Sequence, residues 1–198
     1  MYQKNTFTIY LLKFLLTFSI LYYGTFAWIG IVAPGGLYCA FADKWLDYVS
    51  GMRAALLHSS KLLLDVLGYN VYLLGIDSIK LPSGRGVHVG YDCIGYGVMF
   101  FWVAFIFANK GSVAKKMKWI AGGLLAIFIV NIGRVVLMVI GIQHQWIAPF
   151  DLDNHTLFNI AAYTVIFTMI YLFDRSQKRA SFGSGSSGDN GKDSSSGA

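Results

Sequence analysis

The stretch WIAGGLLAIFIVNIGRVVLMVIGI, residues 119–142, decides which class of fold this chain can adopt. It is apolar apart from Asn131 and Arg134. Its length suits an α-helix that crosses the hydrocarbon core of a bilayer, which needs about 20 residues at about 1.5 Å per residue. We therefore predict that these residues form a membrane-spanning helix with two polar side chains in its second half.

Three other segments have the same apolar character, namely residues 7–32, 91–108 and 156–173. The composition agrees, because 56% of the 198 residues are hydrophobic and only 13% are charged. The mean hydropathy is +0.55. These values exclude an ordinary soluble domain and are typical of a multi-pass membrane protein. We predict one membrane-embedded domain over residues 1–180, followed by a disordered Ser/Gly-rich tail over residues 181–198.

Basic residues beside the apolar segments predict the orientation. They precede the first segment, fill the short loop between the second and third, and follow the fourth. By the positive-inside rule these regions are cytoplasmic, so we expect a multi-pass protein of the inner (cytoplasmic) membrane with both termini inside. The same rule explains the net charge of +6 without a nucleic-acid partner. The residues concerned are Lys4, Lys110, Lys115, Lys116, Lys118, Arg175, Lys178 and Arg179.

The long segment between the first two spans is expected to be folded and extracytoplasmic. Residues 52–67 (MRAALLHSSKLLLDVL) have the periodicity of an amphipathic helix that ends at Gly68. Residues 71–92 indicate a small β-hairpin whose turn is PSGRG. The fold prediction is thus an all-α integral membrane protein of about four transmembrane helices, with this helix and hairpin between the first two. The expected apolar face of the amphipathic helix is Met52, Ala55, Leu56, Leu63 and Leu67, and the expected polar face is Arg53, His58, Ser60 and Lys61.

This topology places three residue types used in acyl transfer on the outer side of the membrane. Cys93 lies at the outer end of the second span, Arg134 in the outer half of the third, and His155 at the head of the fourth. A cysteine attacks as its thiolate, and a helix N-terminus favours negative charge. A histidine can accept the thiol proton or protonate a leaving amine. An arginine stays charged and can hold a carbonyl oxygen.

Together these residues predict attack on an amide to form a thioester, which water or an amine then resolves. Asp92 is expected to support the site because it adjoins the cysteine. Asn131 is expected to support it because it lies three residues before the arginine, on the same helical face. This chemistry requires no metal and no organic cofactor.

The three blocks resemble the exosortase/archaeosortase family of integral-membrane cysteine transpeptidases. The typical first block of that family is Glu-Cys-Ser-Gly, so this chain has isoleucine where serine is usual. Many members have about eight spans, so a chain with four spans resembles a compact form that keeps the catalytic core. The resemblance extends over about residues 60–173 and rests on Asp92-Cys93-Ile94-Gly95, Asn131-x-x-Arg134-Val135 and His155.

The resemblance implies a cysteine peptidase or transpeptidase that cleaves the C-terminal sorting signal of exported, membrane-anchored proteins. Its catalytic residues at the outer membrane face would be Cys93, Arg134 and His155. Its partners would be those exported proteins and the surrounding membrane lipids.

Two other functions are compatible with the sequence. If Cys93 is an inert packing residue, Arg134 a structural cation and His155 a local helix residue, the protein is a non-enzymatic transporter or assembly subunit with a structural Arg/Asn/Asp cluster. Alternatively, the same thiol serves an acyltransferase that acts on lipid or polysaccharide precursors. His88 is the alternative base, and Cys39 is interpreted as structural.

Overall fold

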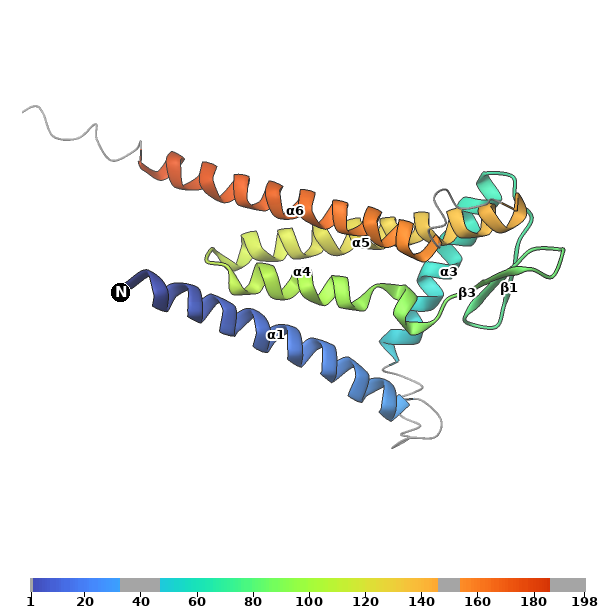
Figure 1. Ribbon diagram of the computed structural model, residues 1–198, viewed down its shortest axis with the longest axis horizontal. Coiled ribbons are helices and arrows are strands. Elements are labelled where there is room, and N and C mark those ends of the chain that lie inside the picture. The colour runs from blue at the N-terminus through green and yellow to red at the C-terminus, as the bar shows by residue number, and fades with distance from the viewer. Residues whose placement is uncertain (1, 33–46, 146–153, 186–198) are drawn as a thin grey trace, which may run out of the picture.

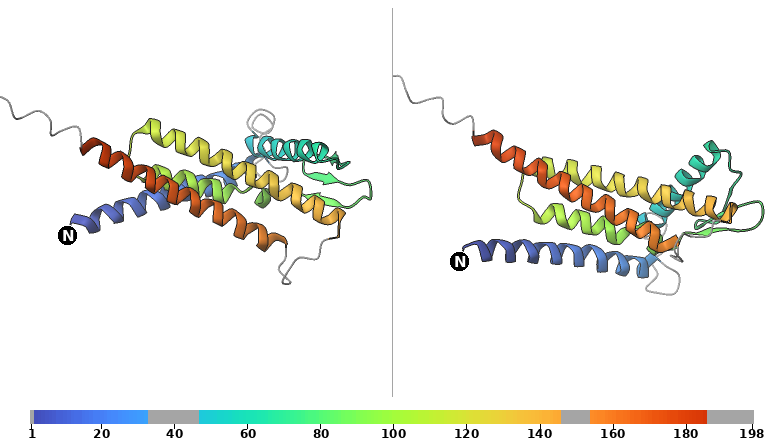
Figure 2. Two further views of the ribbon diagram at one scale, coloured as in Figure 1. Left: turned by 90° about the horizontal axis from the view of Figure 1, so that it is seen from above. Right: turned by 45° about the horizontal axis from the view of Figure 1, so that its top comes forward.

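The computed structural model describes residues 2–32, 47–145 and 154–185 of the chain. It is mostly helical, and four helices run along the length of the molecule (Figure 1, Figure 2). α4 packs between α1 and α5, and α6 packs on α5. The four helices are α1 (Tyr2–Val32), α4 (Tyr96–Ala108), α5 (Val113–Gln143) and α6 (Asn154–Gly185).

Two of these helices are long and apolar enough to cross a membrane, within the part of the chain that the structure describes. The two apolar stretches are Phe7–Ile31 in α1 and Val113–Gln143, which is α5. They correspond to the predicted spans 7–32 and 119–142. α4 is also apolar but has only 13 residues. α6 continues to Gly185, whereas the predicted tail begins at residue 181, and residues 186–198 lie outside the described part.

The predicted span over residues 91–108 is interrupted near its start. It begins with η1 (Tyr91–Ile94), a short 3-10 turn, and becomes α-helical only after Gly95. Gly95 has φ 81°, a left-handed conformation that glycine adopts without a clash from Cβ. Cys93 therefore lies in a separate turn before α4 and not in the first turn of one long helix.

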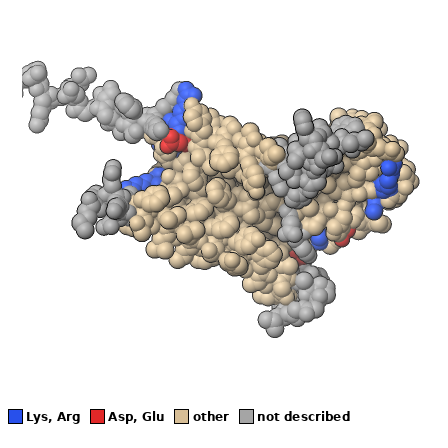
Figure 3. All heavy atoms as spheres, in the orientation of Figure 1, with Lys and Arg blue, Asp and Glu red and all other residues tan. Residues whose placement is uncertain are grey.

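The two ends of the molecule are formed by different elements (Figure 1). The N-terminus, the α4–α5 connection and the C-terminal end of α6 lie at one end, which we call the lysine end. The turn η1, helix α3 (Tyr48–Val66) and the β-sheet lie at the other, which we call the sheet end. Figure 3 shows charged side chains toward both ends and a broad uncharged band between them on the visible face. A bilayer around the middle of the bundle accounts for this band.

Helix α3 contains the predicted amphipathic helix, but the prediction of its faces was wrong in part, although Leu56 is buried and His58 exposed as predicted. Leu63 and Leu67, expected to face inward, are 39% and 52% exposed. Arg53 and Ser60, expected to face outward, are 6% and 0% exposed. Ser60 tolerates burial because its hydroxyl donates to the Leu56 carbonyl at 2.7 Å. The buried face, with helical spacing, consists of Val49, Arg53, Leu56, Leu57, Ser60 and Leu64.

The predicted β-hairpin is in fact a three-stranded antiparallel sheet in the order β1-β2-β3. Its central strand pairs Ile79 with Leu73 on one side and with Val87 on the other. The first predicted arm folds back on itself because Gly75 adopts φ 65°, which permits a tight turn between β1 and β2. The strands are β1 (Tyr72–Leu74), β2 (Ser78–Lys80) and β3 (Gly86–His88).

Two apolar clusters hold these elements together. The first joins α3, the sheet and Ile94 to the second half of α5, through Val135, Val136 and Val139. The second lies between α4, α5 and α6 and centres on Trp102, which is fully buried. The indole nitrogen of Trp102 donates to the Trp119 carbonyl at 3.0 Å, so this buried polar group is satisfied. Gly123 leaves room for the ring, because a Cβ there would overlap the indole.

We expect Gly123→Ala to destabilise the protein, because the added methyl overlaps a buried ring that cannot move freely. Overpacking of this kind costs about 1–3 kcal/mol. Thermal unfolding of the purified protein in detergent measures the change. Gly122→Ala is the matched control, because nothing lies within 4 Å of a Cβ at Gly122, and alanine is the better helix former. Equal melting temperatures for the two variants would contradict the packing described for Trp102.

Candidate functional site

Cys93 lies in η1, between β3 and α4, at the sheet end of the molecule. Its thiol is free and the residue is partly buried. Its backbone N–H donates to the Gly90 carbonyl at 3.0 Å, which closes the turn. Part of the side chain packs against the first apolar cluster. The structure thus places the predicted nucleophile on a short, hydrogen-bonded turn whose position depends on its neighbours.

Asn131 of α5 fixes the junction that follows this turn. Its side-chain amide donates to the carbonyl of Ile94 at 2.8 Å, and the side chain is buried, with 7% exposed. Gly95 makes this approach possible, because a Cβ there would stand 2.5 Å from the Asn131 amide nitrogen. The helix that carries the candidate arginine is therefore tied directly to the residue after Cys93.

Arg134 lies three residues beyond Asn131 on α5 and faces a small cavity between three helices. The cavity has a volume of about 80 Å³, enough for a few water molecules or a carbonyl group. Two guanidinium nitrogens of Arg134, Nε and Nη2, are buried and have no hydrogen-bond partner among the described residues. The cavity is lined by Gly95, Val98, Ile127, Val130, Asn131, Arg134, Ala162 and Val165.

Two unsatisfied N–H donors beside an empty space are the features expected of a site for a hydrogen-bond acceptor. Buried donors without partners are costly, and a guanidinium presents its donors in one plane. A carbonyl or carboxylate oxygen entering the cavity would supply the missing bonds. The site is formed jointly by α4, α5 and α6, so it depends on how these helices pack.

For His155 and Asp92, the structure describes the position of the backbone only. His155 is the second residue of α6, and Asp92 precedes Cys93 in η1; their side chains lie outside the described part of the structure. Ala162 of α6 lines the Arg134 cavity. His155 lies seven positions before Ala162, which is about 10 Å along the helix. His155 therefore lies in the first turn of α6, on the sheet-end side of the cavity. Cys39 lies outside the described residues.

The structure unites Gly95, Asn131 and Arg134 and places Cys93 two residues from this group. Cys93 itself does not line the cavity. Residues of α6 such as Val165 were not predicted, because single aliphatic side chains carry no chemical signal in a sequence. Within the described ranges, no three His, Cys, Asp or Glu residues are grouped as metal ligands.

His88, the alternative base, takes part in a different cluster within the sheet. Its Nδ1 lies 3.3 Å from the Ser78 hydroxyl and 3.7 Å from a carboxylate oxygen of Asp77. The Ser78 hydroxyl also lies 2.8 Å from that carboxylate, to which it donates. In a Ser-His-Asp triad the serine hydroxyl donates to the histidine, which in turn donates to the aspartate. Here the Ser78 hydroxyl donates to Asp77 instead, so His88 does not activate it.

Comparison with known families identifies the chain. The family described as "Transmembrane exosortase (Exosortase_EpsH)" matches residues 5–172, which is most of the sequence. The chain belongs to the transmembrane exosortase family. The match confirms the resemblance based on Cys93, Arg134 and His155 and extends it to include α1. Neither the curated proteins nor the solved structures that were compared gave a match.

Family membership makes this chain a membrane protein and an exosortase, a class of membrane-embedded transpeptidases for sorting signals. The position at which this exosortase departs from the typical first block is Ile94. Its side chain is 1% exposed and belongs to the first apolar cluster. In this exosortase the side chain of Ile94 therefore belongs to the apolar core, and its backbone carbonyl accepts the hydrogen bond from Asn131.

We expect Gly95→Ala to disrupt the junction after Cys93 for two reasons. The left-handed φ of 81° disfavours a side chain, and the new Cβ would meet the Asn131 amide. A loss of at least about 1–3 kcal/mol follows from the backbone strain, measured as a lower melting temperature. Gly97→Ala is the control, because its Cβ would make only an ordinary contact with Tyr22 at 3.8 Å.

A double-mutant cycle separates the two causes. Asn131→Ala removes the steric partner, so Gly95→Ala should cost less in that background, although the strain of φ persists. Equal cost in both backgrounds would mean that the two residues do not contact each other.

Proposed function

We propose that this exosortase is a cysteine-dependent peptidase or transpeptidase that cleaves the C-terminal sorting signal of exported, membrane-anchored proteins. The observation that carries the proposal is that Arg134 lines a cavity beside the Cys93 turn and that two of its guanidinium nitrogens have no hydrogen-bond partner among the described residues. Family membership supplies the class of reaction. A peptide carbonyl is an acceptor compatible with both findings.

The proposed reaction has two stages. His155 takes the proton of the Cys93 thiol. The sulfur then attacks the scissile carbonyl carbon while Arg134 donates hydrogen bonds to the carbonyl oxygen, on which negative charge develops. The C–N bond breaks, His155 gives a proton to the leaving amine, and a thioester remains on the sulfur. Water or an amine then attacks the thioester carbon and gives its proton to His155. The C–S bond breaks, and His155 passes the proton to the sulfur, which regenerates the thiol. Asp92 and Asn131 support this site, the latter by holding the Ile94 carbonyl.

The proposed topology has four spans, near residues 7–32, 91–108, 119–142 and 156–173. Both termini are cytoplasmic, and the active site is at the outer face of the inner membrane. Support comes from the lysine end, where the N-terminus, the α4–α5 connection and the end of α6 lie together (Figure 1). It is also supported by the uncharged band between the two ends (Figure 3). The domain ends near residue 180, before the Ser/Gly-rich tail.

An apolar groove offers a place for the substrate's own membrane helix. It has a volume of about 420 Å³ and lies between α1, α4 and α6. Val98 lines both this groove and the Arg134 cavity, so the two spaces meet at the same side chain. A helix in the groove would present the residue that precedes it near the cavity. The groove is lined by Phe18, Gly97, Val98, Phe101, Tyr163, Ile166, Phe167 and Ile170.

One observation favours the non-enzymatic alternative. Cys93 packs partly against the first apolar cluster and does not line the Arg134 cavity. In a transporter or assembly subunit the thiol would remain in that position and never react. Catalysis instead requires the Cys93 turn to present its sulfur to the substrate. Loss of function in a cysteine variant that still folds distinguishes the two.

We expect Cys93→Ala to abolish processing of an exported reporter that carries a C-terminal sorting signal, because the proposed thioester forms on the Cys93 sulfur. Processing is followed by the change in reporter mass, and the thioester is trapped as a hydroxamate with hydroxylamine. Cys39→Ala is the control and should process normally. Full processing by a well-folded Cys93→Ala variant would exclude the mechanism.

Arg134→Lys should lower the processing rate about 100- to 1,000-fold, as is usual when an oxyanion donor is lost. Lysine keeps the positive charge but lacks the planar pair of donors. Alkylation of Cys93 by a thiol reagent should proceed as in the wild type, which shows that the turn is intact. Arg175→Lys, at an exposed position of α6 that does not line the cavity, is the control. If Arg134→Lys processed at the wild-type rate, a carbonyl-binding role for Arg134 would be excluded.

A further inference from the structure

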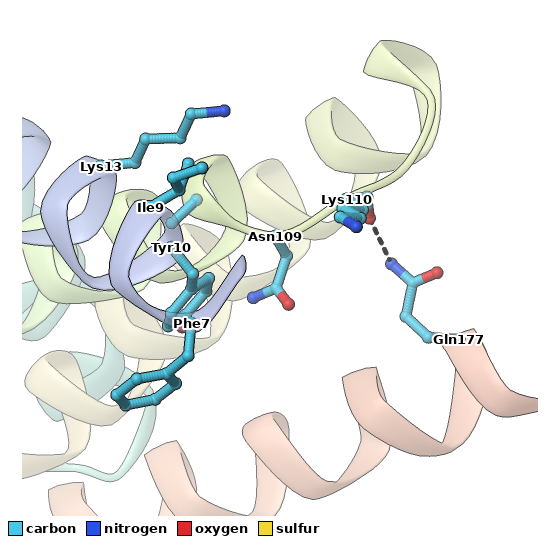
Figure 4. A pocket seen from close by; sticks show the side chains of 8 residues that line it. Phe7, Ile9, Tyr10, Lys13, Asn109, Lys110 and Gln177 are labelled. Atoms are coloured by element: carbon cyan, nitrogen blue, oxygen red, sulfur yellow. Dashed lines mark hydrogen bonds between the residues drawn. The ribbon is translucent and has the colours of Figure 1, made fainter. Parts of the chain in front are cut away.

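A large cavity lies at the lysine end, far along the bundle from Cys93. It has a volume of about 840 Å³ and is bordered by three separate elements, α1, the α4–α5 connection and α6 (Figure 4). Neither the proposed reaction nor its substrate groove uses it. Its lining residues are Phe7, Ile9, Tyr10, Lys13, Ala108, Asn109, Lys110 and Gln177.

The charged groups of this cavity are cations. Lys13 and Lys110 line it, and no Asp or Glu is among its lining residues in the described part of the chain. Lys13 belongs to the apolar stretch Phe7–Ile31, six residues after its start, which is about 9 Å along the helix. A lysine at such a depth is costly unless its ammonium reaches polar headgroups or an anion. Lys13 and Lys110 together therefore favour a negatively charged occupant.

The other walls of the cavity are of two kinds. Phe7 and Ile9 are apolar and mostly exposed, at 65% and 53%, so they present hydrocarbon surface beside the cavity. Tyr10 and Asn109 add polar side chains within it (Figure 4). A ligand that is anionic at one end and apolar at the other matches this distribution. A free phosphate ion would leave the apolar walls unmatched.

One hydrogen bond connects two of the elements that border the cavity. The side-chain amide of Gln177 on α6 donates to the backbone carbonyl of Lys110 at 3.3 Å (Figure 4). This bond joins α6 to the α4–α5 connection, whereas α1 packs chiefly on α4 and α6 chiefly on α5. An occupant of the cavity would therefore bridge α1 and α6, the two helices that flank the apolar groove.

We propose that this cavity is a binding site for an anionic phospholipid. Lys13 and Lys110 bind its phosphate, and the acyl chains lie along the exposed apolar surface of Phe7 and Ile9. Basic pockets between membrane helices at the cytoplasmic side bind anionic headgroups in this way. The bound lipid holds α1 against α6 and stabilises the arrangement of the helices around the groove. The site is independent of the cysteine chemistry.

The test uses the full-length protein, purified in detergent and stripped of lipid. Phosphatidylglycerol or phosphatidylcholine is added back, and bound lipid is counted by native mass spectrometry while the melting temperature is recorded. We expect phosphatidylglycerol to be retained and to raise the melting temperature, and phosphatidylcholine to do neither. Lys13→Ala/Lys110→Ala should weaken phosphatidylglycerol binding about tenfold or more, because two charges near the headgroup are lost.

The matched control is Lys115→Ala/Lys118→Ala. It removes the same charge from lysines close in sequence that do not line the cavity, so binding should persist. Lys13→Arg/Lys110→Arg keeps the charges and should also retain the lipid, which guards against a folding defect. Equal losses in the cavity and control variants would overturn the proposal in favour of general surface attraction. So would a full stabilising effect of inorganic phosphate alone, or equal retention of phosphatidylcholine.

Discussion

The hydrogen bond from Asn131 to the carbonyl of Ile94 is the interaction on which the arrangement of the candidate site depends. The chain breaks its helix at Gly95, and a break frees backbone groups that must find new partners where water is scarce. The Asn131 amide supplies one. Because Asn131 is three residues before Arg134 on the same helix, one side chain sets both the Cys93 turn and the position of the guanidinium.

Ile94 contributes to this junction through its side chain as well. Burial of an isoleucine side chain is worth about 1.5–3 kcal/mol, and here it anchors η1 to the valines of α5. A serine at this position would place a hydroxyl in the same apolar cluster, where it would need a partner of its own. A serine and an isoleucine thus require different surroundings, and in this chain the surroundings of Ile94 are apolar.

Hydropathy predicted the two long spans because a stretch of about 20 apolar residues has few other stable states. The shared face of Asn131 and Arg134 followed from their spacing alone. Local conformation was harder to predict. Gly75 and Gly95 each reverse or break an apolar run, and a glycine in a run does not reveal whether its φ will be positive. The prediction for the faces of α3 was wrong at Arg53 and Ser60 because it relied on their polarity, although their spacing with Leu56 and Leu64 is that of a packed stripe.

The candidate site shows why chemistry can be predicted from sequence more readily than its geometry. Cysteine, arginine and histidine can be identified as candidates from their residue types alone, and the charge pattern predicts that they lie at one end of the molecule. The cavity in front of Arg134, however, is formed by Gly95, Val98 and two aliphatic residues of α6, which owe their role entirely to packing. A buried guanidinium with unsatisfied donors lowers stability in the absence of a ligand. In the proposed reaction, a substrate carbonyl would complete those bonds and recover this free energy at the reacting atom, most strongly when negative charge develops there in the transition state.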